Sequence, residues 1–262
     1  MKLSYTTYLI GKNLNFDESV ALAVKTGCAG IEFRTGGIFP HGVEVSLTAR
    51  QRKEKRRAIE DKFLEVACIN SPHELHNPSA AERKKVVAAA VKSVELAADL
   101  GCTRVRIFGN HIPEKVNAQD CVAYVGEALG EIADEALPMG VDVLLEMHGQ
   151  FNYWGYTIPA VKHADRCNVG LLYNCDNRDL VGGSVSETFS RVKPIVKHIH
   201  MHGVESGFPY LELFEELVRM DYQGYISAEV DATSDPYRVL KIQNTAVRAL
   251  IDLARMRVGY IK

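Results

Sequence analysis

With 262 residues, of which 47% are hydrophobic, the chain is long enough for one large domain with a sizeable core. Its formal net charge of −2 argues against binding to nucleic acid or to an anionic membrane surface, and no segment reaches the roughly 18 consecutive apolar residues of a membrane-spanning helix. The six cysteines form no C-x-x-C pair and the N-terminus lacks the apolar segment of a signal peptide, so we expect reduced cysteines and a cytoplasmic protein.

Short strand-like runs alternate with longer helical patterns along the whole chain. Because strands that alternate with helices form βαβ units with a parallel sheet, eight such units predict a closed (β/α)8 barrel, the TIM-barrel architecture of the α/β class. An open doubly wound sheet is the alternative, but no G-x-G-x-x-G follows the first strand. We expect a single domain over residues 1–262, with strands at 3–9, 29–34, 65–70, 103–108, 141–146, 169–175, 195–201 and 224–229, and helices near 17–26, 48–62, 79–100, 115–137, 157–166, 185–193, 208–220 and 235–256.

Capping residues support these boundaries. Gly27, Gly101 and Gly140 each follow a helical run and precede a strand, which is the usual place of a glycine that ends a helix. Asp17 and Ser79 stand at helix starts and are predicted to be N-caps.

Four residues that can bind a metal ion occur at the ends of four consecutive predicted strands. Glu146, Asp176, His200 and Glu229 are separated by 30, 24 and 29 residues, close to the average of about 31 residues per unit in a barrel of this length. Barrel enzymes carry their chemistry at this end of the strands, so the four side chains should converge. Three converging carboxylates would repel one another, and a divalent cation resolves this conflict. The donor set suits one Mn²⁺, Mg²⁺, Co²⁺ or Zn²⁺ ion and does not select among them.

Side-chain alternation identifies further candidates on the same strands. His198, His200 and His202 share one face of the seventh strand. His198 lies deepest and is interpreted as a hydrogen-bonded core residue, whereas His202 is closer to the mouth and is predicted to contact the substrate. His148 points the same way as Glu146 and is a second predicted substrate contact.

Five weaker candidates for substrate binding rest on position alone. Glu32 shares a face of the second strand with Arg34, and it could line the barrel mouth or pair with a neighbour. His73 falls in the expected loop after the third strand, where it could reach a substrate hydroxyl. Trp154 lies in an aromatic loop that could cover the apolar face of a sugar or cap the barrel. Arg34 and Arg178 are candidates for binding a phosphate, although no P-loop or clear basic clamp is present.

The second half of the chain resembles a known family. Residues 144–148 (LLEMH) resemble an L-x-E-x-H strand, residues 198–200 (HIH) an H-x-H strand, and residues 224–230 (GYISAEV) the terminal glutamate segment of the xylose-isomerase-like TIM-barrel superfamily. Its members include sugar and sugar phosphate isomerases and epimerases. The resemblance implies that Glu146, Asp176, His200 and Glu229 are the metal ligands.

Two positions depart from the family pattern. Family members often carry a histidine three residues after the aspartate ligand, where this chain has Asp179. Ketose 3-epimerases carry a further glutamate six residues past the first ligand, where this chain has Asn152. These departures count against a free-ketose 3-epimerase. The absence of a D-x-H sequence after the seventh strand counts against an endonuclease IV-like phosphodiester hydrolase with three metals.

The leading hypothesis is a divalent-metal-dependent isomerase or epimerase of a small sugar, sugar phosphate or other polyhydroxy carbonyl compound. Glu146 and Glu229 would move a proton on carbon, and the metal would stabilise an enediolate. The runner-up is a lyase resembling inosose dehydratase, with His148 or His202 as general acid. A non-catalytic sugar-binding protein is a further alternative. The expected partner is a small carbohydrate, without nucleic acid or membrane, and a homo-oligomer is compatible with the sequence.

Overall fold

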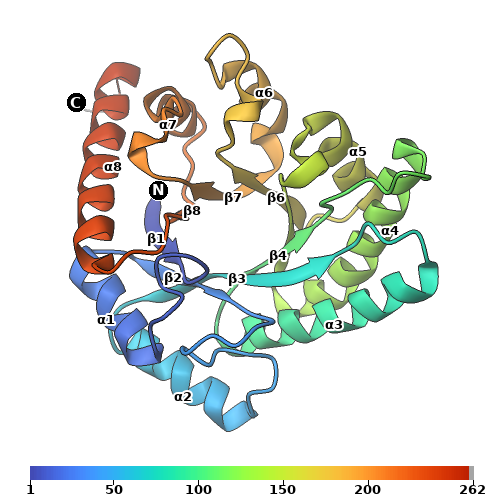
Figure 1. The fold of residues 1–262 in the computed structure, drawn as a ribbon, viewed down its shortest axis with the longest axis horizontal. Helices are drawn as coiled ribbons and strands as arrows, with labels where there is room; N and C mark the ends of the chain where they lie inside the picture. The colour runs from blue at the N-terminus through green and yellow to red at the C-terminus, as the bar shows by residue number, and fades with distance from the viewer. Residues whose placement is uncertain (260–262) are drawn as a thin grey trace.

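The computed structural model describes residues 1–259, which form a closed barrel of eight parallel strands surrounded by eight α-helices (Figure 1). The predicted (β/α)8 barrel is therefore confirmed. The strands are β1 (Lys2–Thr6), β2 (Gly30–Arg34), β3 (Glu65–Glu74), β4 (Arg104–Phe108), β5 (Asp142–Glu146), β6 (Val169–Asn174), β7 (Val196–Met201) and β8 (Tyr225–Ala228). The α-helices are α1 (Phe16–Thr26), α2 (Ala49–Glu60), α3 (Ala80–Asp99), α4 (Ala118–Ala136), α5 (Trp154–Ala164), α6 (Ser186–Val192), α7 (Tyr210–Arg219) and α8 (Pro236–Val258). Short 3-10 helices are η1 (Leu137–Met139), η2 (Gly149–Asn152), η3 (Asn177–Asp179), η4 (Lys193–Ile195) and η5 (Val204–Ser206).

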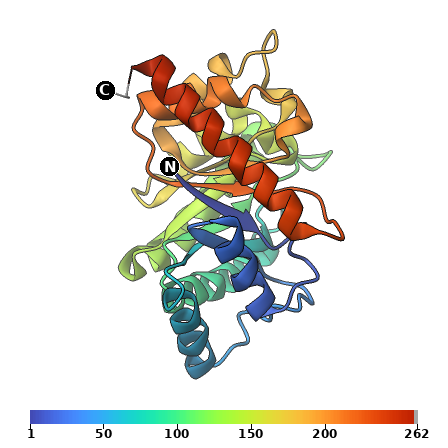
Figure 2. The ribbon, with the colours of Figure 1, turned by 90° about the vertical axis from the view of Figure 1, so that its left-hand side faces the viewer.

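The barrel closes where the first and last strands meet. β1 pairs in parallel with both β2 and β8, so the first and last units of the chain lie side by side. The long helix α8 then packs across α1 and α7 on the outside of this junction (Figure 2). Within residues 1–259, no helix combines the length and the apolar character needed to cross a membrane.

Helix caps follow the sequence signals with one exception. The Asn15 side chain accepts a hydrogen bond from the Glu18 backbone N–H, and the Glu18 carboxylate accepts one from the Asn15 N–H. This reciprocal pair makes Asn15 the N-cap of α1, so the prediction of Asp17 was wrong. Asp17 lies in the first turn, where its negative charge interacts favourably with the helix dipole. Ser79 caps α3 and Gly27 ends α1 in the left-handed conformation, both as predicted.

Two elements differ in extent from the sequence expectation. β3 continues beyond residue 70 because its register against β4 shifts, which lets Glu74 pair with Phe108. His73 therefore lies on a strand rather than in a loop. α5 begins at Trp154, so this tryptophan opens a helix instead of standing in the expected loop.

Alternation along the strands separates an apolar outer layer from a polar interior. On β2, Ile31 and Phe33 belong to the hydrophobic core, while Glu32 between them makes polar contacts across the barrel. The interior also holds Ser4 and Ser227, whose hydroxyl oxygens lie 2.6 Å apart. Most apolar burial is therefore found between the strands and the helices, and the interior towards the carboxyl ends of the strands carries charge.

The contact between α4 and α5 depends on a glycine. A Cβ atom at Gly126 would lie 2.7 Å from the Ala160 carbonyl oxygen. Alanine favours a helix over glycine by roughly 0.5–1 kcal/mol, but overpacking a tight contact costs about 1–3 kcal/mol. We expect Gly126→Ala to lower the free energy of unfolding by about 1–2 kcal/mol in urea denaturation. The matched control is Gly130→Ala one turn later, where the added atom would lie 3.1 Å from the Ala164 carbonyl oxygen and should cost less. A Gly126→Ala protein as stable as the unaltered chain would contradict the close packing.

Candidate active site

A cavity of about 460 Å³ opens at the carboxyl ends of the strands. It contains most of the side chains that the sequence assigned to metal or substrate, which come from β2, β5 and the segments after β5, β6, β7 and β8. We call it the mouth cavity, and it is lined by Tyr8, Arg34, Glu74, Arg106, Phe108, Asn110, Glu146, His148, Asn174, Asp176, Arg178, His202 and Glu229.

Three of the four predicted metal ligands converge at the base of this cavity. Glu146, His200 and Glu229 each offer one donor atom, and these atoms lie within 4.8 Å of one another. The Nδ1 atom of His200 lies 3.2 Å from Glu146 Oε1 and 3.5 Å from Glu229 Oε2. His200 is fully buried, whereas the Glu229 side chain is 13% exposed towards the cavity. The strand ends therefore position two carboxylates around one imidazole nitrogen.

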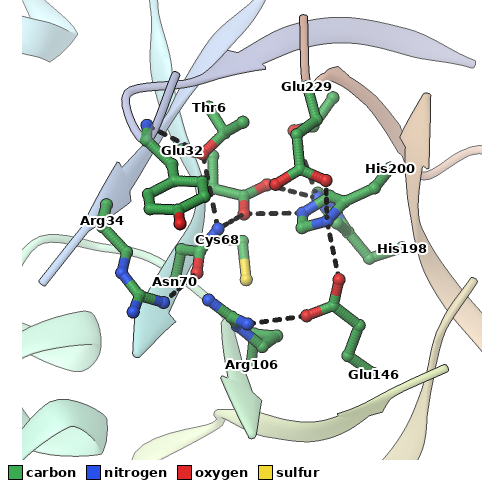
Figure 3. A network of polar contacts seen from close by, with 12 residues as sticks. Thr6, Glu32, Arg34, Cys68, Asn70, Arg106, Glu146, His198, His200 and Glu229 are labelled. Atoms are coloured by element: carbon green, nitrogen blue, oxygen red, sulfur yellow. Dashed lines mark hydrogen bonds and ion pairs between the residues drawn. The ribbon is translucent and has the colours of Figure 1, made fainter. Parts of the chain in front are cut away.

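The other ring nitrogen of His200 is held by Glu32 from across the barrel (Figure 3). Glu32 is fully buried, and its Oε1 accepts hydrogen bonds from His200 Nε2 at 2.7 Å and from Asn70 Nδ2 at 2.8 Å. Its Oε2 accepts one from His198 Nε2 at 2.8 Å. Burial alone would raise the pKa of Glu32, but the charge of His200 and the two histidine hydrogen bonds hold it well below its usual value. Of the two roles predicted for Glu32, the structure supports pairing with neighbours, because the side chain does not line the mouth cavity.

The protonation of His200 follows from the same contacts. Burial would lower the pKa of this imidazole, but the charges of Glu32 and Glu229 and the hydrogen bond with Glu146 raise it well above its usual value. A positively charged His200 can donate from Nε2 to Glu32 and from Nδ1 to Glu146. His198 below it is a buried, hydrogen-bonded residue, in agreement with the sequence interpretation.

Arg106 on β4 is the main site residue that sequence reasoning missed. Its Nη1 lies 2.7 Å from Glu146 Oε2, and its guanidinium stacks 3.6 Å from the centre of the Phe108 ring. Burial would raise the pKa of Glu146, but the Arg106 charge and the contacts with His200 lower it to about 2. The available signal was an arginine between Val105 and Ile107, at an alternate position of an otherwise buried strand.

Asp176, the fourth predicted ligand, lies at the rim of the mouth cavity and outside the cluster of three. Both carboxylate oxygens contact Arg178, with Nη2 2.5 Å from Oδ2 and Nε 3.0 Å from Oδ1. Arg178 also donates to the Gly149 carbonyl oxygen at 3.3 Å. The two predicted site residues therefore form an ion pair with each other across the loop that follows β6.

The predicted substrate contacts divide between the mouth cavity and other places. His148 and His202 line the cavity, and His148 Nδ1 lies 2.9 Å from Asn110 Oδ1. His73 does not line it: its Nε2 atom lies 3.0 Å from Ser93 Oγ on α3, on the outer side of the strand. Trp154 packs against the guanidinium of Arg191 on α6, at 4.3 Å from its ring centre.

Trp154 belongs to a second hollow beside the mouth cavity. This aromatic hollow has a volume of about 750 Å³ and shares Arg178 with the mouth cavity. It is lined by His111, Gly149, Gln150, Asn152, Tyr153, Trp154, Tyr156, Arg178, Asp179, Val181 and Thr188. The two residues that depart from the family pattern meet in its wall, where Asn152 Nδ2 donates to Asp179 Oδ1 at 2.7 Å. Burial, followed by the charge of Asp176, raises the pKa of Asp179 to about 7.

A closed parallel barrel with carboxylates and an imidazole gathered at the carboxyl ends of its strands defines an α/β-barrel protein with an enzyme-like cavity. The sequence profile of the family described as "Xylose isomerase-like TIM barrel" matches residues 20–255. The chain belongs to this family, and the resemblance seen in residues 144–230 is confirmed.

Two related proteins are sugar isomerases by name. The inosose isomerase of Halalkalibacterium halodurans is 24% identical over 220 residues, which cover 82% of this chain and 76% of that protein. The 2-oxo-tetronate isomerase of Cupriavidus necator is 26% identical over 154 residues, which cover 53% of this chain and 58% of that protein. The match with the second relative therefore spans little more than half of its length.

Solved structures of low identity share the whole fold. A structure of L-ribulose 3-epimerase is 15% identical with a TM-score of 0.84, and the alignment covers 100% of this chain and 98% of that one. A structure of the IOLI protein with a zinc atom is 16% identical with a TM-score of 0.77, covering 98% and 99%. At these identities the likeness extends to the fold alone.

The raised pKa of Asp179 predicts how stability changes with pH. Asp179 ionises at a pH of about 7 in the folded chain, but near its usual pKa of about 4 once the chain unfolds. The proton bound by the folded chain therefore stabilises it fully below pH 4, and this stabilisation is lost as the pH rises from about 4 to 7. Asp179→Asn removes that loss and keeps an oxygen that can accept from Asn152. The free energy of unfolding of the variant, measured by urea denaturation relative to that of the unaltered chain, should therefore increase by about 1–3 kcal/mol when the pH is raised from 5 to 8. Asp134→Asn is the control: this carboxylate of α4 is exposed and paired with Arg166, which lowers its pKa, so the variant should show no such trend between pH 5 and pH 8. A difference for Asp179→Asn that is the same at both pH values would contradict the assignment.

Proposed function

We propose that this protein is a divalent-metal-dependent isomerase or epimerase of a small sugar or related polyhydroxy carbonyl compound. The observation that carries the proposal is the convergence of Glu146, His200 and Glu229 at the base of the mouth cavity. Two carboxylates that face one imidazole nitrogen are suited both to holding a cation and to moving a proton on carbon. The names of the two related isomerases support the same class of reaction.

The residues present fit a divalent ion. The donors are two carboxylate oxygens and the Nδ1 atom of His200, which would lose its proton when an ion binds, and this set suits Mn²⁺, Mg²⁺, Co²⁺ or Zn²⁺. Glu32 accepts a hydrogen bond from Nε2 of His200, which leaves Nδ1 as the atom that faces the two glutamates. Metal-binding histidines usually have such an outer carboxylate or carbonyl partner. We assign Asp176 as the fourth ligand. Its carboxylate would contact the ion either after it leaves Arg178 or through one oxygen while the other stays paired with Arg178.

A bound ion would supply Lewis-acid stabilisation of the negative charge that develops on substrate oxygen. Glu229 is the carboxylate we assign to remove the proton from carbon, because it is partly exposed to the cavity and no arginine contacts it within residues 1–259. Both oxygens of Glu146 have partners, with Arg106 on Oε2 and His200 on Oε1. Glu146 therefore has the stronger positioning role, and it would exchange a proton on the opposite side of the substrate in an epimerisation.

Metal binding should depend on Asp176. Asp176→Asn should raise the dissociation constant for Mn²⁺, measured by calorimetry, at least about 10-fold, because it removes an anionic donor from the cavity rim. Asp179→Asn is the matched control: it makes the same change three residues later, in the wall of the aromatic hollow, and should bind within about threefold of the unaltered chain. Unchanged affinity in Asp176→Asn would remove this residue from the ligand set. Failure of the unaltered chain to bind Mn²⁺, Mg²⁺, Co²⁺ or Zn²⁺ at millimolar concentration would contradict the metal site.

Proton transfer should be visible as isotope exchange. In D₂O, a substrate found by screening four- to six-carbon aldoses, ketoses and their acids should acquire deuterium on the carbon next to the carbonyl, detected by NMR. Glu229→Gln should lower turnover and exchange at least about 100-fold, the usual scale for loss of a general acid–base group. Glu65→Gln at the opposite end of the barrel is the control and should retain activity.

Two other outcomes of that experiment would redirect the proposal. Loss of water to give an enone or diketone product would indicate the lyase, with His148 as the cavity residue placed to protonate the leaving hydroxyl. Direct transfer of a carbon-bound label between carbons would indicate a hydride shift and remove Glu229 from its role.

A further inference from the structure

We propose that the substrate carries a terminal anionic group, a carboxylate or a phosphate ester, and that Arg34 binds it. This inference rests on the proposed function, because it defines the class of substrate for the same cavity. It is carried by the pairing of the guanidinium groups in that cavity and by the chemistry of their contacts, of which Figure 3 shows those of Arg34 and Arg106.

Three arginines from three different strands or strand ends line the mouth cavity. Arg106 pairs with Glu146 at 2.7 Å, and Arg178 pairs with Asp176 at 2.5 Å. Arg34 on β2 has no carboxylate within 4 Å among residues 1–259. Two of the three positive charges are therefore matched by the protein, and the third is open to a ligand.

The contacts of Arg34 hold its side chain in place without neutralising it. Its Nη1 donates to Asn70 Oδ1 at 3.1 Å and to the Ser71 carbonyl oxygen at 3.3 Å, and its guanidinium lies 5.2 Å from the centre of the Tyr8 ring. These hydrogen bonds use one of its three nitrogens. In the described part of the chain, Nε and Nη2 make no hydrogen bond to protein. Arg34 lines the mouth cavity, and Nε and Nη2 on one edge of a guanidinium can bind an oxyanion through two parallel hydrogen bonds.

The position of Arg34 makes an unmatched charge unfavourable. The side chain is largely buried, and burial together with the neighbouring Arg106 charge lowers its pKa to about 10. The group is thus still positively charged near neutral pH, in a place where positive charge is disfavoured. Buried charges are ordinarily paired, so the missing partner is expected to arrive with the ligand.

The size of the cavity restricts the ligand to a small molecule. Its volume of about 460 Å³ lies towards the lower end of the range for small-molecule sites. Glu229 and Arg34 line the same cavity, so one compound can present its reactive carbon to the carboxylate and its anionic end to the guanidinium. A sugar acid and a short sugar phosphate share this chemistry, and a neutral sugar lacks it.

Binding of compounds that cannot react tests the anion site separately from catalysis. The probes are L-threonate, erythritol 4-phosphate and erythritol, which carry a carboxylate, a phosphate and no charge and contain no ketone or aldehyde. Calorimetry with and without 1 mM Mn²⁺ should show at least one anion binding 10-fold or more tightly than erythritol, since charge-assisted hydrogen bonds to arginine are strong. Tighter binding of threonate would identify a sugar acid, and tighter binding of the phosphate a sugar phosphate.

Variants assign the effect to Arg34. Arg34→Gln should reduce the preference for the anion to within about threefold, and Arg34→Lys should keep part of it, because lysine retains the charge but loses the two-pronged geometry. Arg57→Gln on exposed α2 makes the same change in net charge away from the cavity and should bind like the unaltered chain. A circular dichroism melting curve checks that each variant is folded. If erythritol binds as tightly as both anions, or if Arg34→Gln keeps the full preference, the proposal is overturned.

The two proposals fail in different ways. Anion binding through Arg34 without turnover of any polyhydroxy carbonyl compound would leave the anion site standing and reject the isomerase. Turnover of a neutral sugar by a protein with no preference for the anions would support the isomerase and reject the anion site.

Discussion

The carboxylate of Glu32 is the constraint on which the site depends. A fully buried anion is tolerated only when its oxygens are matched, and here His198, His200 and Asn70 supply the three donors. These partners come from β7 and β3, so one side chain of β2 joins three strands across the barrel. Because Nε2 of His200 is committed to this contact, Nδ1 can only face the opposite wall, where Glu146 and Glu229 stand. The contact with Glu32 thus fixes the orientation of His200, the candidate metal ligand.

The fold separates most of its hydrophobic packing and its charged groups into two layers. Barrels of this kind usually fill their interior with branched apolar side chains, and their stability is spread over both faces of the strands. Here the outward residues, such as Phe33 and Ile107, form the core with the helices, while the inward residues include serines, asparagine, arginine, glutamates and histidines besides two leucines, Leu144 and Leu172. The hydrophobic contribution to folding is therefore concentrated outside the barrel, and the interior holds charges whose cost must be offset by pairing.

The sequence was informative where periodicity governs structure. Strand and helix alternation predicted the barrel, and the spacing of strand ends brought Glu146, His200 and Glu229 together. It was less informative beyond the strand ends, where side-chain alternation no longer applies. Asp176 lies two residues past the end of β6 and forms an ion pair with Arg178, a local contact that no spacing rule predicts. The pairing of Arg106 with Glu146 was also hidden, because it depends on the register of β4 against β5, and register follows from packing of the assembled barrel.

The charges of the mouth cavity are matched unevenly by the protein. Its lining contains four carboxylates, from Glu74, Glu146, Asp176 and Glu229, and three guanidiniums, while the buried charges of Glu32 and of protonated His200 offset each other beneath it. A divalent ion bound through Nδ1 of His200 would displace that proton, so the gain of about one positive charge would offset the one net negative charge of the lining. The overall charge therefore does not select the substrate, and the selection depends on local pairing. Arg106 and Arg178 have carboxylate partners, whereas Arg34 has none within 4 Å among residues 1–259. One part of the cavity thus favours a cation, and another part, the open guanidinium of Arg34, favours an anionic group of the substrate.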